Sequence, residues 1–429
     1  MAERQTEANA PEFFEFFAGG GMARLGLEQA GFACRFANDL DPAKCAAYRA
    51  NFGDADLIEG DVADLEPDAL PAGAPDLVWA SFPCQDLSLA GGRAGMKGAR
   101  SGVFWPFWRL MEALDAQGRG AKLIVIENVL GLATSRGGVD LMAIAAALAG
   151  SGRRFTTLAI DAARFLPQSR PRLFVIAWTP DLAPPPELVA EAPAPEWTPS
   201  GLAKTLAALH PSVAEAFVPL NPPAPSGGPA SLSDLVEATP RDVRWRSETE
   251  IADLLGMMTD AHRARVAAAQ TEAVRTGRAQ AGCLYRRMRP DGQGGAAQRA
   301  EVRFDIAGCL RTPAGGSSRQ TLLLAEPDGS LRARLLSARE AARLMGLPES
   351  YRLPDRYTDA YRLAGDGVAA PVARYLAEAI ALPILASRDA AAEARRVISP
   401  ENATTPFSRP VVKANRADVP GERRSATAP

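Results

Sequence analysis

The stretch "FFEFFAGGGMARLGLEQAGF" (residues 13–32) decides the fold, because it predicts a buried strand, a glycine turn and a helix in direct succession. The apolar run at 13–19 predicts the strand, and the pattern at 21–32 predicts the helix. The three glycines between them let the backbone approach a ligand closely, and the N-terminus of the helix presents free amide groups there. A turn of this kind is typical of many nucleotide-binding folds.

Short apolar runs and helical patterns continue to alternate over the first 180 residues. Further strands are expected at 34–40, 54–62, 76–82, 122–128, 154–160 and 172–178, and helices at 42–52, 103–117 and 138–150. Asp41 and Pro42 supply an N-cap followed by proline at the first helical position. The alternation predicts an α/β fold with a doubly wound, mostly parallel sheet, whose ligands bind at the carboxyl ends of the strands.

Beyond residue 181 the composition changes. Two proline-rich stretches, 180–200 and 221–231, are typical of connectors, and the weak periodicity of 240–310 predicts a smaller, irregular domain. A strongly apolar helix follows the glycine turn at 365–367, and it is too apolar to stand on a small domain. We therefore expect a first domain at 11–182, a second at 183–335, a segment at 336–390 that returns to the first domain, and a disordered tail at 391–429.

The amino-acid composition excludes several kinds of structural and catalytic site. The five cysteines form no close pairs, so neither a disulfide framework nor a zinc site is expected, and with two histidines we expect no metal centre. No uncharged apolar run is long enough to span a bilayer, and residues 1–4 lack the basic start of a signal peptide, so we expect a cytoplasmic protein without a membrane partner. The net charge is −2, but arginines cluster at 164–172, 284–290 and 331–343 and suit contacts to phosphates and guanine edges.

Carboxylates follow two of the expected strands. Asp39 comes about twenty residues after the glycines, where an acceptor for ribose hydroxyls belongs, and Asp61 ends the next strand. Two acids at one edge of the sheet would repel a pyrophosphate. A ligand with ribose, adenine and a cationic centre fits better, and S-adenosylmethionine is such a ligand.

The next strand ends expose a thiol, a carboxyl group and guanidinium groups. Cys84 lies in "SFPCQDLSLAGGR" (81–93), Glu127 in "ENV" (127–129), and Arg170 and Arg172 in "QSRPR" (168–172). Together these groups can polarise a pyrimidine ring: the thiol adds at C6, the glutamate holds N3 and an arginine holds O2. C5 then becomes nucleophilic towards a sulfonium methyl group.

The order "FAGGG…NDLD…EGDV…PCQDLS…ENV…QSRPR…RTPAGGSSRQ…LLSAREAARLMGLP…GDGVAAPV" resembles the bacterial cytosine-5 DNA methyltransferase family. The resemblance covers residues 13 to about 385, except the stretch between QSRPR and RTPAGG. It implies a Rossmann-like methyltransferase domain, S-adenosylmethionine as cofactor and duplex DNA as substrate. It also implies that Cys84 is the nucleophile, that Glu127 and Arg172 bind a flipped cytosine, and that the loop from Gln85 to Arg100 closes over DNA.

The resemblance places the remaining site residues as well. The cofactor residues it implies are Phe17, Gly19, Gly21, Asp39, Leu40, Asp61, Pro83 and Asp366. The variable region at about 185–330 matches the target-recognition part of the family, and arginines in "LYRRMRP" and "RTPAGGSSRQ" are candidates for phosphate and base contacts. The DNA contacts expected are Gln85, Ser88, Arg93, Arg286, Arg287, Arg289, Arg311 and Arg319.

Two positions depart from the family pattern. Glu15 stands where the first motif usually has aspartate, and Asp366 stands where the last motif, G-N-x-V, has asparagine. Asparagine donates hydrogen bonds and an ionised aspartate does not, so Asp366 cannot make the usual contact to the cofactor or to the cysteine loop. Two alternatives stay open: Asp366 attracts the sulfonium electrostatically, or it is a tolerated substitution at the edge of the surface.

Three other functions fit the sequence less well. An RNA cytosine-5 methyltransferase shares the fold, but the chain has no matching cysteine-phenylalanine-threonine signature. A catalytically idle DNA-binding homologue would have no need for Cys84, Glu127 and Arg172 together. A hydride-transferring dehydrogenase would have to bind a pyrophosphate beside Asp39 and Asp61. We therefore expect a monomeric, nucleoid-associated DNA methyltransferase without an obligate protein partner. Three settings stay open for it: a restriction–modification system, a phage, or a solitary enzyme.

Overall fold

The computed structural model describes residues 10–83, 102–226, 230–290, 295–311 and 319–387. The chain divides into two units, residues 1–388 and 389–429, and all the described residues belong to the first. The predicted tail at 391–429 lies outside the described residues. The domain limits predicted from the sequence stay predictions.

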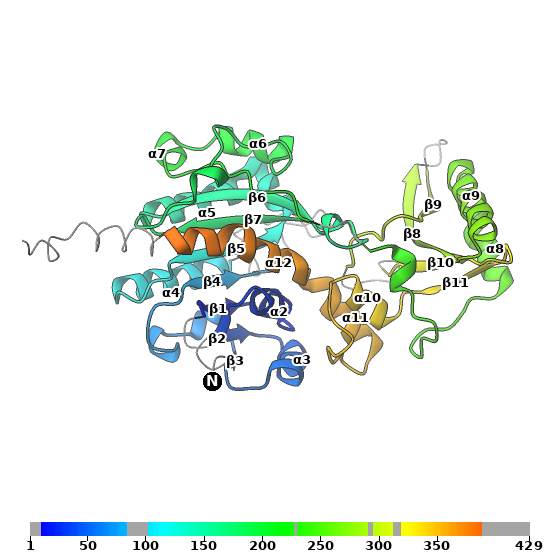
Figure 1. The fold of residues 1–429 in the computed structure, drawn as a ribbon, viewed down its shortest axis with the longest axis horizontal. Helices are drawn as coiled ribbons and strands as arrows, with labels where there is room; N and C mark the ends of the chain where they lie inside the picture. Colours follow the sequence, from blue (N-terminus) through cyan, green and yellow to red (C-terminus); the bar gives the residue numbers. More distant parts are fainter. Residues whose placement is uncertain (1–9, 84–101, 227–229, 291–294, 312–318, 388–429) are drawn as a thin grey trace, which may run out of the picture. The chain divides into compact units, whose positions relative to one another are not determined.

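A seven-stranded sheet forms the centre of the first unit, with the strand order β3-β2-β1-β4-β5-β7-β6 (Figure 1). Its strands are β1 (Glu12–Phe16), β2 (Ala33–Asp39), β3 (Leu57–Glu59), β4 (Leu77–Ala80), β5 (Leu123–Val129), β6 (Arg154–Asp161) and β7 (Pro171–Trp178). The pairs among β1 to β5 are parallel, and β7 runs antiparallel to both β5 and β6. The predicted doubly wound, mostly parallel sheet is therefore confirmed.

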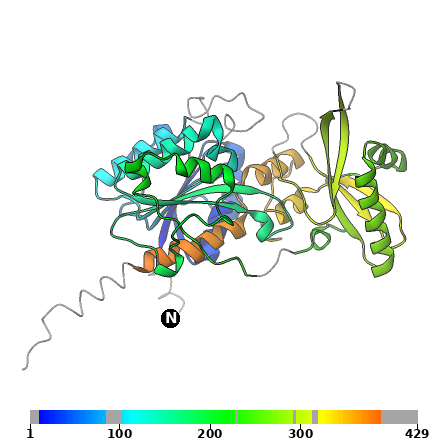
Figure 2. The ribbon, with the colours of Figure 1, turned by 90° about the horizontal axis from the view of Figure 1, so that it is seen from above.

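Helices cover both faces of this sheet because successive strand residues point to opposite sides. Phe13, Trp79 and Val125 share a core cluster with residues of α2 (Met22–Gln29) and α12 (Ala370–Leu376). The intervening residues, such as Val78 and Ile126, share another with α4 (Phe104–Ala116) and α5 (Val139–Gly150). Figure 2 shows α4 and α5, in cyan, and α12, in orange, on opposite sides of the sheet.

Two local signals explain where the first elements begin and end. β1 ends at Phe16, earlier than the apolar run 13–19 indicated, because Phe17 adopts φ 58° and leaves the extended conformation. α3 (Pro42–Phe52) begins as predicted, since the Asp41 side chain accepts hydrogen bonds from the backbone N–H groups of Ala43 and Lys44.

A second, four-stranded antiparallel sheet has the order β11-β10-β8-β9. Its strands are β8 (Gln280–Pro290), β9 (Ala296–Arg303), β10 (Thr321–Ala325) and β11 (Leu331–Leu335), and the helices α8 (Glu248–Gly256) and α9 (Asp260–Thr276) precede them in the chain. The expectation of irregular structure at 240–310 is corrected by these elements. Their signal in the sequence is weak because α9 packs through small side chains, Ala269 and Ala273, and because the second half of β8 is exposed.

The segment between the two sheets packs on the larger one. α6 (Ser200–Ala207) places Leu202 and Leu206 in the core cluster that holds α4 and α5. The backbone N–H of Ala159 in β6 donates to the carbonyl of Trp197, 2.7 Å away. Residues 197–206, assigned from the sequence to the second domain, thus pack on the large sheet.

The C-terminal part of the first unit comprises α10 (Ala338–Arg343), α11 (Tyr357–Asp366) and α12, of which α11 had no counterpart in the sequence prediction. α12 lies against α2 at Gly26, where an added Cβ would come within 2.3 Å of the Ala370 carbonyl oxygen. The segment Tyr357–Ser387, which contains α11 and α12, is long and apolar enough to cross a membrane, but 61% of its apolar window is buried inside the protein. We therefore interpret it as part of the core.

Candidate active site

The glycine turn between β1 and α2 is held by side chains from two directions. Gly19 and Gly21 have φ values of 57° and 76°, a region in which glycine is favoured. The N–H of Gly19 donates to Asp39 Oδ2 at 2.7 Å, and the Tyr351 hydroxyl donates to the Gly20 carbonyl at 2.6 Å. The turn therefore has a fixed shape at the N-terminus of α2, where backbone amides can face a ligand.

Asp39 is the buried carboxylate of this region. Its other oxygen accepts from the N–H of Asp41 at 2.8 Å. Burial raises the pKa of Asp39, opposed by the hydrogen bond from Asp41 and by the positive charge of Lys44. Since each carboxylate oxygen has two lone pairs, both oxygens keep one acceptor position for a ligand hydroxyl.

The neighbouring predicted cofactor residues differ in exposure. The Leu40 side chain is 63% exposed and directly follows the buried Asp39. Asp61 accepts from the N–H of Ala63 at 2.9 Å and begins a short 3₁₀ turn. An uncovered apolar surface beside an oriented carboxylate fits the adenine and ribose of S-adenosylmethionine.

Glu127 and Arg172 meet at the carboxyl end of β5. Arg172 Nε lies 3.1 Å from Glu127 Oε1, and the two side chains are only 14% and 9% exposed. The antiparallel register of β5 and β7 sets Val129 opposite Arg172, so Glu127 lies two residues along the same face of the sheet. Burial raises the pKa of Glu127, and the charges of Arg172 and Arg170 oppose this shift.

Ser81 and Asn128 connect this pair to the end of β4, and the sequence analysis missed both. Trp79 Nε1 donates to Ser81 Oγ at 2.9 Å, and the Ser81 side chain is hydrogen-bonded to Glu127. Asn128 Nδ2 donates to the Phe82 carbonyl at 3.2 Å. Their only signal in the sequence was their position, since Ser81 begins the stretch 81–93 and Asn128 lies within "ENV" (127–129).

Arg170, which we expected among the groups that polarise the pyrimidine ring, is buried and faces backbone carbonyls. It is 1% exposed, its two terminal nitrogens donate to the carbonyls of Leu310, Gly365 and Gly367 at 3.1, 2.8 and 2.6 Å, and burial lowers its pKa to about 10. Its Nε has no hydrogen-bond partner among the described residues, but the two terminal nitrogens join segments that are far apart in the sequence. We therefore interpret Arg170 as a positioning residue. The sequence alone did not show where its donors point.

Cys309 is a thiol that lies near Arg170 and Arg172. Arg170 Nη1 lies 3.4 Å from its Sγ. Burial opposes ionisation of the thiol, yet the charges of Arg170 and Arg172 lower its pKa. Its only signal in the sequence was its place just before "RTPAGGSSRQ".

Four predicted site residues, Cys84, Gln85, Ser88 and Arg93, lie outside the part of the chain that the structure describes. Pro83, which directly precedes them, is described and exposed.

The predicted DNA-binding arginines lie on different elements. Arg286, Arg287 and Arg289 are on the exposed half of β8, where Arg287 and Arg289 share one face and both approach Glu301, at 3.8 and 2.6 Å. Arg319 lies against α11, with its guanidinium 5.1 Å from the centre of the Tyr357 ring. Arg311 is exposed.

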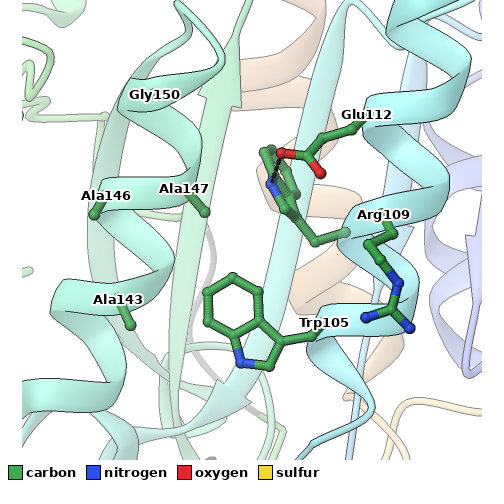
Figure 3. A pocket seen from close by; sticks show the side chains of 8 residues that line it. Trp105, Arg109, Glu112, Ala143, Ala146, Ala147 and Gly150 are labelled. Carbon is green, nitrogen blue, oxygen red and sulfur yellow. Dashed lines mark hydrogen bonds between the residues drawn. The ribbon is translucent and has the colours of Figure 1, made fainter.

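A groove of about 660 Å³ lies between α4 and α5, away from the predicted site residues (Figure 3). Ala143, Ala146, Ala147 and Gly150 line one side, and Trp105 and Arg109 lie opposite, beside a hydrogen bond from Trp108 Nε1 to Glu112 at 3.0 Å. None of the site residues predicted from the sequence lines this groove, so we do not assign the chemistry to it.

Comparison with known proteins adds a family match. The model of the family described as C-5 cytosine-specific DNA methylase matches residues 12–382. Type II methyltransferase M.NlaX of Neisseria lactamica is 27% identical over 385 residues, which cover 88% of this chain and 98% of that protein. Type II methyltransferase M.PspPI of Psychrobacter sp. is 35% identical over 183 residues, 42% of each chain. For M.PspPI and for M.NgoFVII of Neisseria gonorrhoeae, the match spans less than half of the relative, 42% and 46%.

Solved structures share the fold at low identity. The Dnmt2 methyltransferase of S. pombe has a TM-score of 0.52 at 17% identity, with 85% of this chain and 96% of that chain covered. A putative DNA modification methyltransferase encoded within an E. coli prophage has a TM-score of 0.52 at 16% identity, with 88% and 100% covered.

Proposed function

This chain belongs to the C-5 cytosine-specific DNA methylase family, and on that premise we propose that it transfers a methyl group from S-adenosylmethionine to C5 of a cytosine in duplex DNA. The observation that carries the proposal is the buried pair of Glu127 and Arg172, whose atoms lie 3.1 Å apart beside the end of β4. That strand leads directly into Pro83 and Cys84. A thiol, a carboxyl group and a guanidinium thus come from neighbouring strand ends.

The residues divide the reaction between them. The Cys84 thiolate adds to C6 of a flipped-out cytosine, while Glu127, whose pKa is raised by burial, gives its proton to N3 as electrons move into the ring. Arg172 binds O2 of the cytosine and also the carboxylate of Glu127 after Glu127 has given up its proton. C5 then takes the methyl group, N3 returns its proton to Glu127, a base such as water removes the C5 proton, and the thiolate leaves as the C5–C6 double bond returns.

S-adenosylmethionine, when bound, supplies the sulfonium methyl group. We propose that Asp39 accepts hydrogen bonds from its ribose, that Phe17 and Leu40 contact its adenine, and that Gly19 and Gly21 bring the backbone close to it. The remaining residues of the proposed cofactor set are Asp61, Pro83 and Asp366.

The DNA contacts are proposals as well. The exposed half of β8 carries Arg286, Arg287 and Arg289 and suits contacts to the phosphate backbone. Arg311 and Arg319 are proposed contacts, as are Gln85, Ser88 and Arg93 of the loop after Cys84. We propose that residues 183–335 choose the target sequence, that the protein acts as a monomer on nucleoid DNA, and that it serves a restriction–modification system, as the Type II relatives suggest.

The test is label transfer. Full-length protein is incubated with tritiated S-adenosylmethionine and either duplex DNA or RNA of the same sequence. Label at C5 of cytosine in DNA is the expected result. Label in RNA alone would replace the DNA substrate by RNA, and no label in either nucleic acid would overturn the proposed reaction.

A further inference from the structure

Four charged side chains join the turn at 365–367 to the start of α3. Lys44 Nζ lies 3.0 Å from Asp366 Oδ2. Arg362 bridges two carboxylates, since its Nη2 lies 3.1 Å from Asp41 Oδ2 and its Nε lies 3.8 Å from Asp366 Oδ2. The positive charge of Lys44 also opposes the rise in the pKa of Asp39, so Lys44 interacts electrostatically with Asp39 as well as with Asp366. We call Asp39, Asp41, Lys44, Arg362 and Asp366 the Lys44 cluster.

The Lys44 cluster lies at the glycine turn. A Cβ on Gly367 would come within 2.3 Å of Met22 Sδ, and Met22 is the first residue of α2 after Gly21. Asp39 accepts the hydrogen bond from Gly19. The turn that carries Asp366 is itself fixed by Arg170, which donates to the carbonyls on both sides of it. The cluster therefore borders the strand ends to which we assign the methyl donor.

The charges of the Lys44 cluster do not cancel. Three carboxylates and two cations leave a net charge of −1 when all five groups are ionised. The methyl donor carries a sulfonium, an ammonium and a carboxylate, so its net charge is +1, whereas its demethylated product has no net charge. An anionic border therefore favours the donor over the product, and Lys44, by pairing with Asp366, reduces this preference.

We infer that the Lys44 cluster sets the preference of the site for the cationic methyl donor over its neutral product, with Asp366 increasing this preference and Lys44 limiting it. The inference rests on the proposed function, because it takes S-adenosylmethionine as the ligand. It also gives a role to the aspartate that stands where the family motif usually has asparagine. Asp366 is then a specificity-determining residue, and Lys44 is a positioning residue that acts through it.

The test measures binding. Dissociation constants of S-adenosylmethionine and S-adenosylhomocysteine are measured by calorimetry on the full-length protein without DNA. Asp366→Asn should lower the preference for the donor about threefold, and Lys44→Gln should raise it about threefold, as expected for one unit charge near a partly solvated site. The double variant has the net charge of the wild type and should return to the wild-type ratio. The single shifts should shrink at about 0.5 M salt.

Matched controls remove one charge elsewhere. Asp328→Asn, in the turn before β11, and Lys204→Gln, on α6, change the net charge equally and should leave the ratio unaltered. Lys44→Arg keeps the positive charge and should keep the wild-type ratio of dissociation constants, whether or not Lys44→Gln folds. An unchanged ratio in Asp366→Asn, or a shift of both single variants in the same direction, would overturn the inference while the proposed function stands. Binding of neither compound to the wild type would overturn both.

Discussion

Arg172 Nε lies 3.1 Å from Glu127 Oε1 although the two residues come from different strands, and both side chains are largely buried. A buried ion pair is weak evidence for stability, because desolvation offsets much of the attraction. Burial also keeps the pKa of Glu127 raised despite its partner. The pair is therefore better explained by chemistry, as an acid held beside a cation at a strand end.

Glu127→Gln should abolish most of the methyl transfer. An amide cannot give a proton to N3, and loss of general acid catalysis costs about 10²- to 10⁴-fold in rate. In the wild type, single-turnover rates should fall as pH rises through the raised pKa of Glu127, since only the protonated form acts. The residual rate of Glu127→Gln should lack this fall. Glu66→Gln, which changes an exposed carboxylate, should keep the wild-type profile.

Cys84→Ser should keep DNA and cofactor binding but lose methyl transfer, because an alcohol is far less ionised than a thiol at neutral pH. Duplex with 5-fluorocytosine at the target should stay covalently attached to the wild type, since fluorine replaces the proton that elimination requires. The adduct is followed on denaturing gels and mapped by mass spectrometry. Because the charges of Arg170 and Arg172 lower the pKa of Cys309, Cys309→Ser is the control, and it should still form the adduct. An adduct that maps to Cys309 would contradict the assignment of Cys84.

Arg170→Ala should destabilise the protein. The substitution leaves the carbonyls of Leu310, Gly365 and Gly367 without their donor inside the core, which costs about 3–5 kcal/mol. Urea unfolding measures the loss, with exposed Arg278→Ala as the control. A variant of normal stability that has lost only cytosine binding would return Arg170 to the catalytic set.

Glu15 should make stability depend on pH. It is 1% exposed, Oε2 has no hydrogen-bond partner among the described residues, and burial raises its pKa from 4.5 to about 8. A carboxyl group with a raised folded-state pKa contributes stability that is fully present below about pH 4.5 and is lost as pH rises through about 8. Over this window the loss is on the order of a few kcal/mol. Glu15→Gln should flatten the melting temperature between about pH 5 and 8.5, whereas Glu66→Gln should not.

The arginines of β8 should govern the salt dependence of DNA binding. Arg287 and Arg289 share a single carboxylate, Glu301, so this face of the strand keeps a positive charge. Changing Arg286, Arg287 and Arg289 to alanine should weaken binding and reduce the slope of log K against log salt by about one unit for each phosphate that is no longer bound. Fluorescence anisotropy at several salt concentrations measures the slope. Arg275→Ala, which removes a similar pair with Glu272, should leave it unchanged. A parallel decrease in cofactor affinity would identify the β8 arginines as structural.

The sequence by itself determined the large sheet and the types of residue at its strand ends. Alternating apolar runs and helices fix the order of elements through local periodicity, and strands buried on both faces give the strongest signal of that kind. Glu127 and Asp39 could be located in this way, because the carboxyl ends of parallel strands meet at one edge. The antiparallel sheet at 280–335 was less visible, since α9 packs through alanines and half of β8 is exposed.

Only the tertiary structure decided which side chains face the proposed site of the reaction and which bind backbone groups and stabilise the fold. Arg170 and Arg172 are two residues apart in one motif, yet one donates to backbone carbonyls and the other pairs with Glu127. Lys44 and Asp366 are far apart in the sequence and meet only because α12 packs on α2 and brings the turn at 365–367 to the glycine turn. Such pairings depend on long-range packing and on the direction of individual donors, and local sequence patterns encode neither.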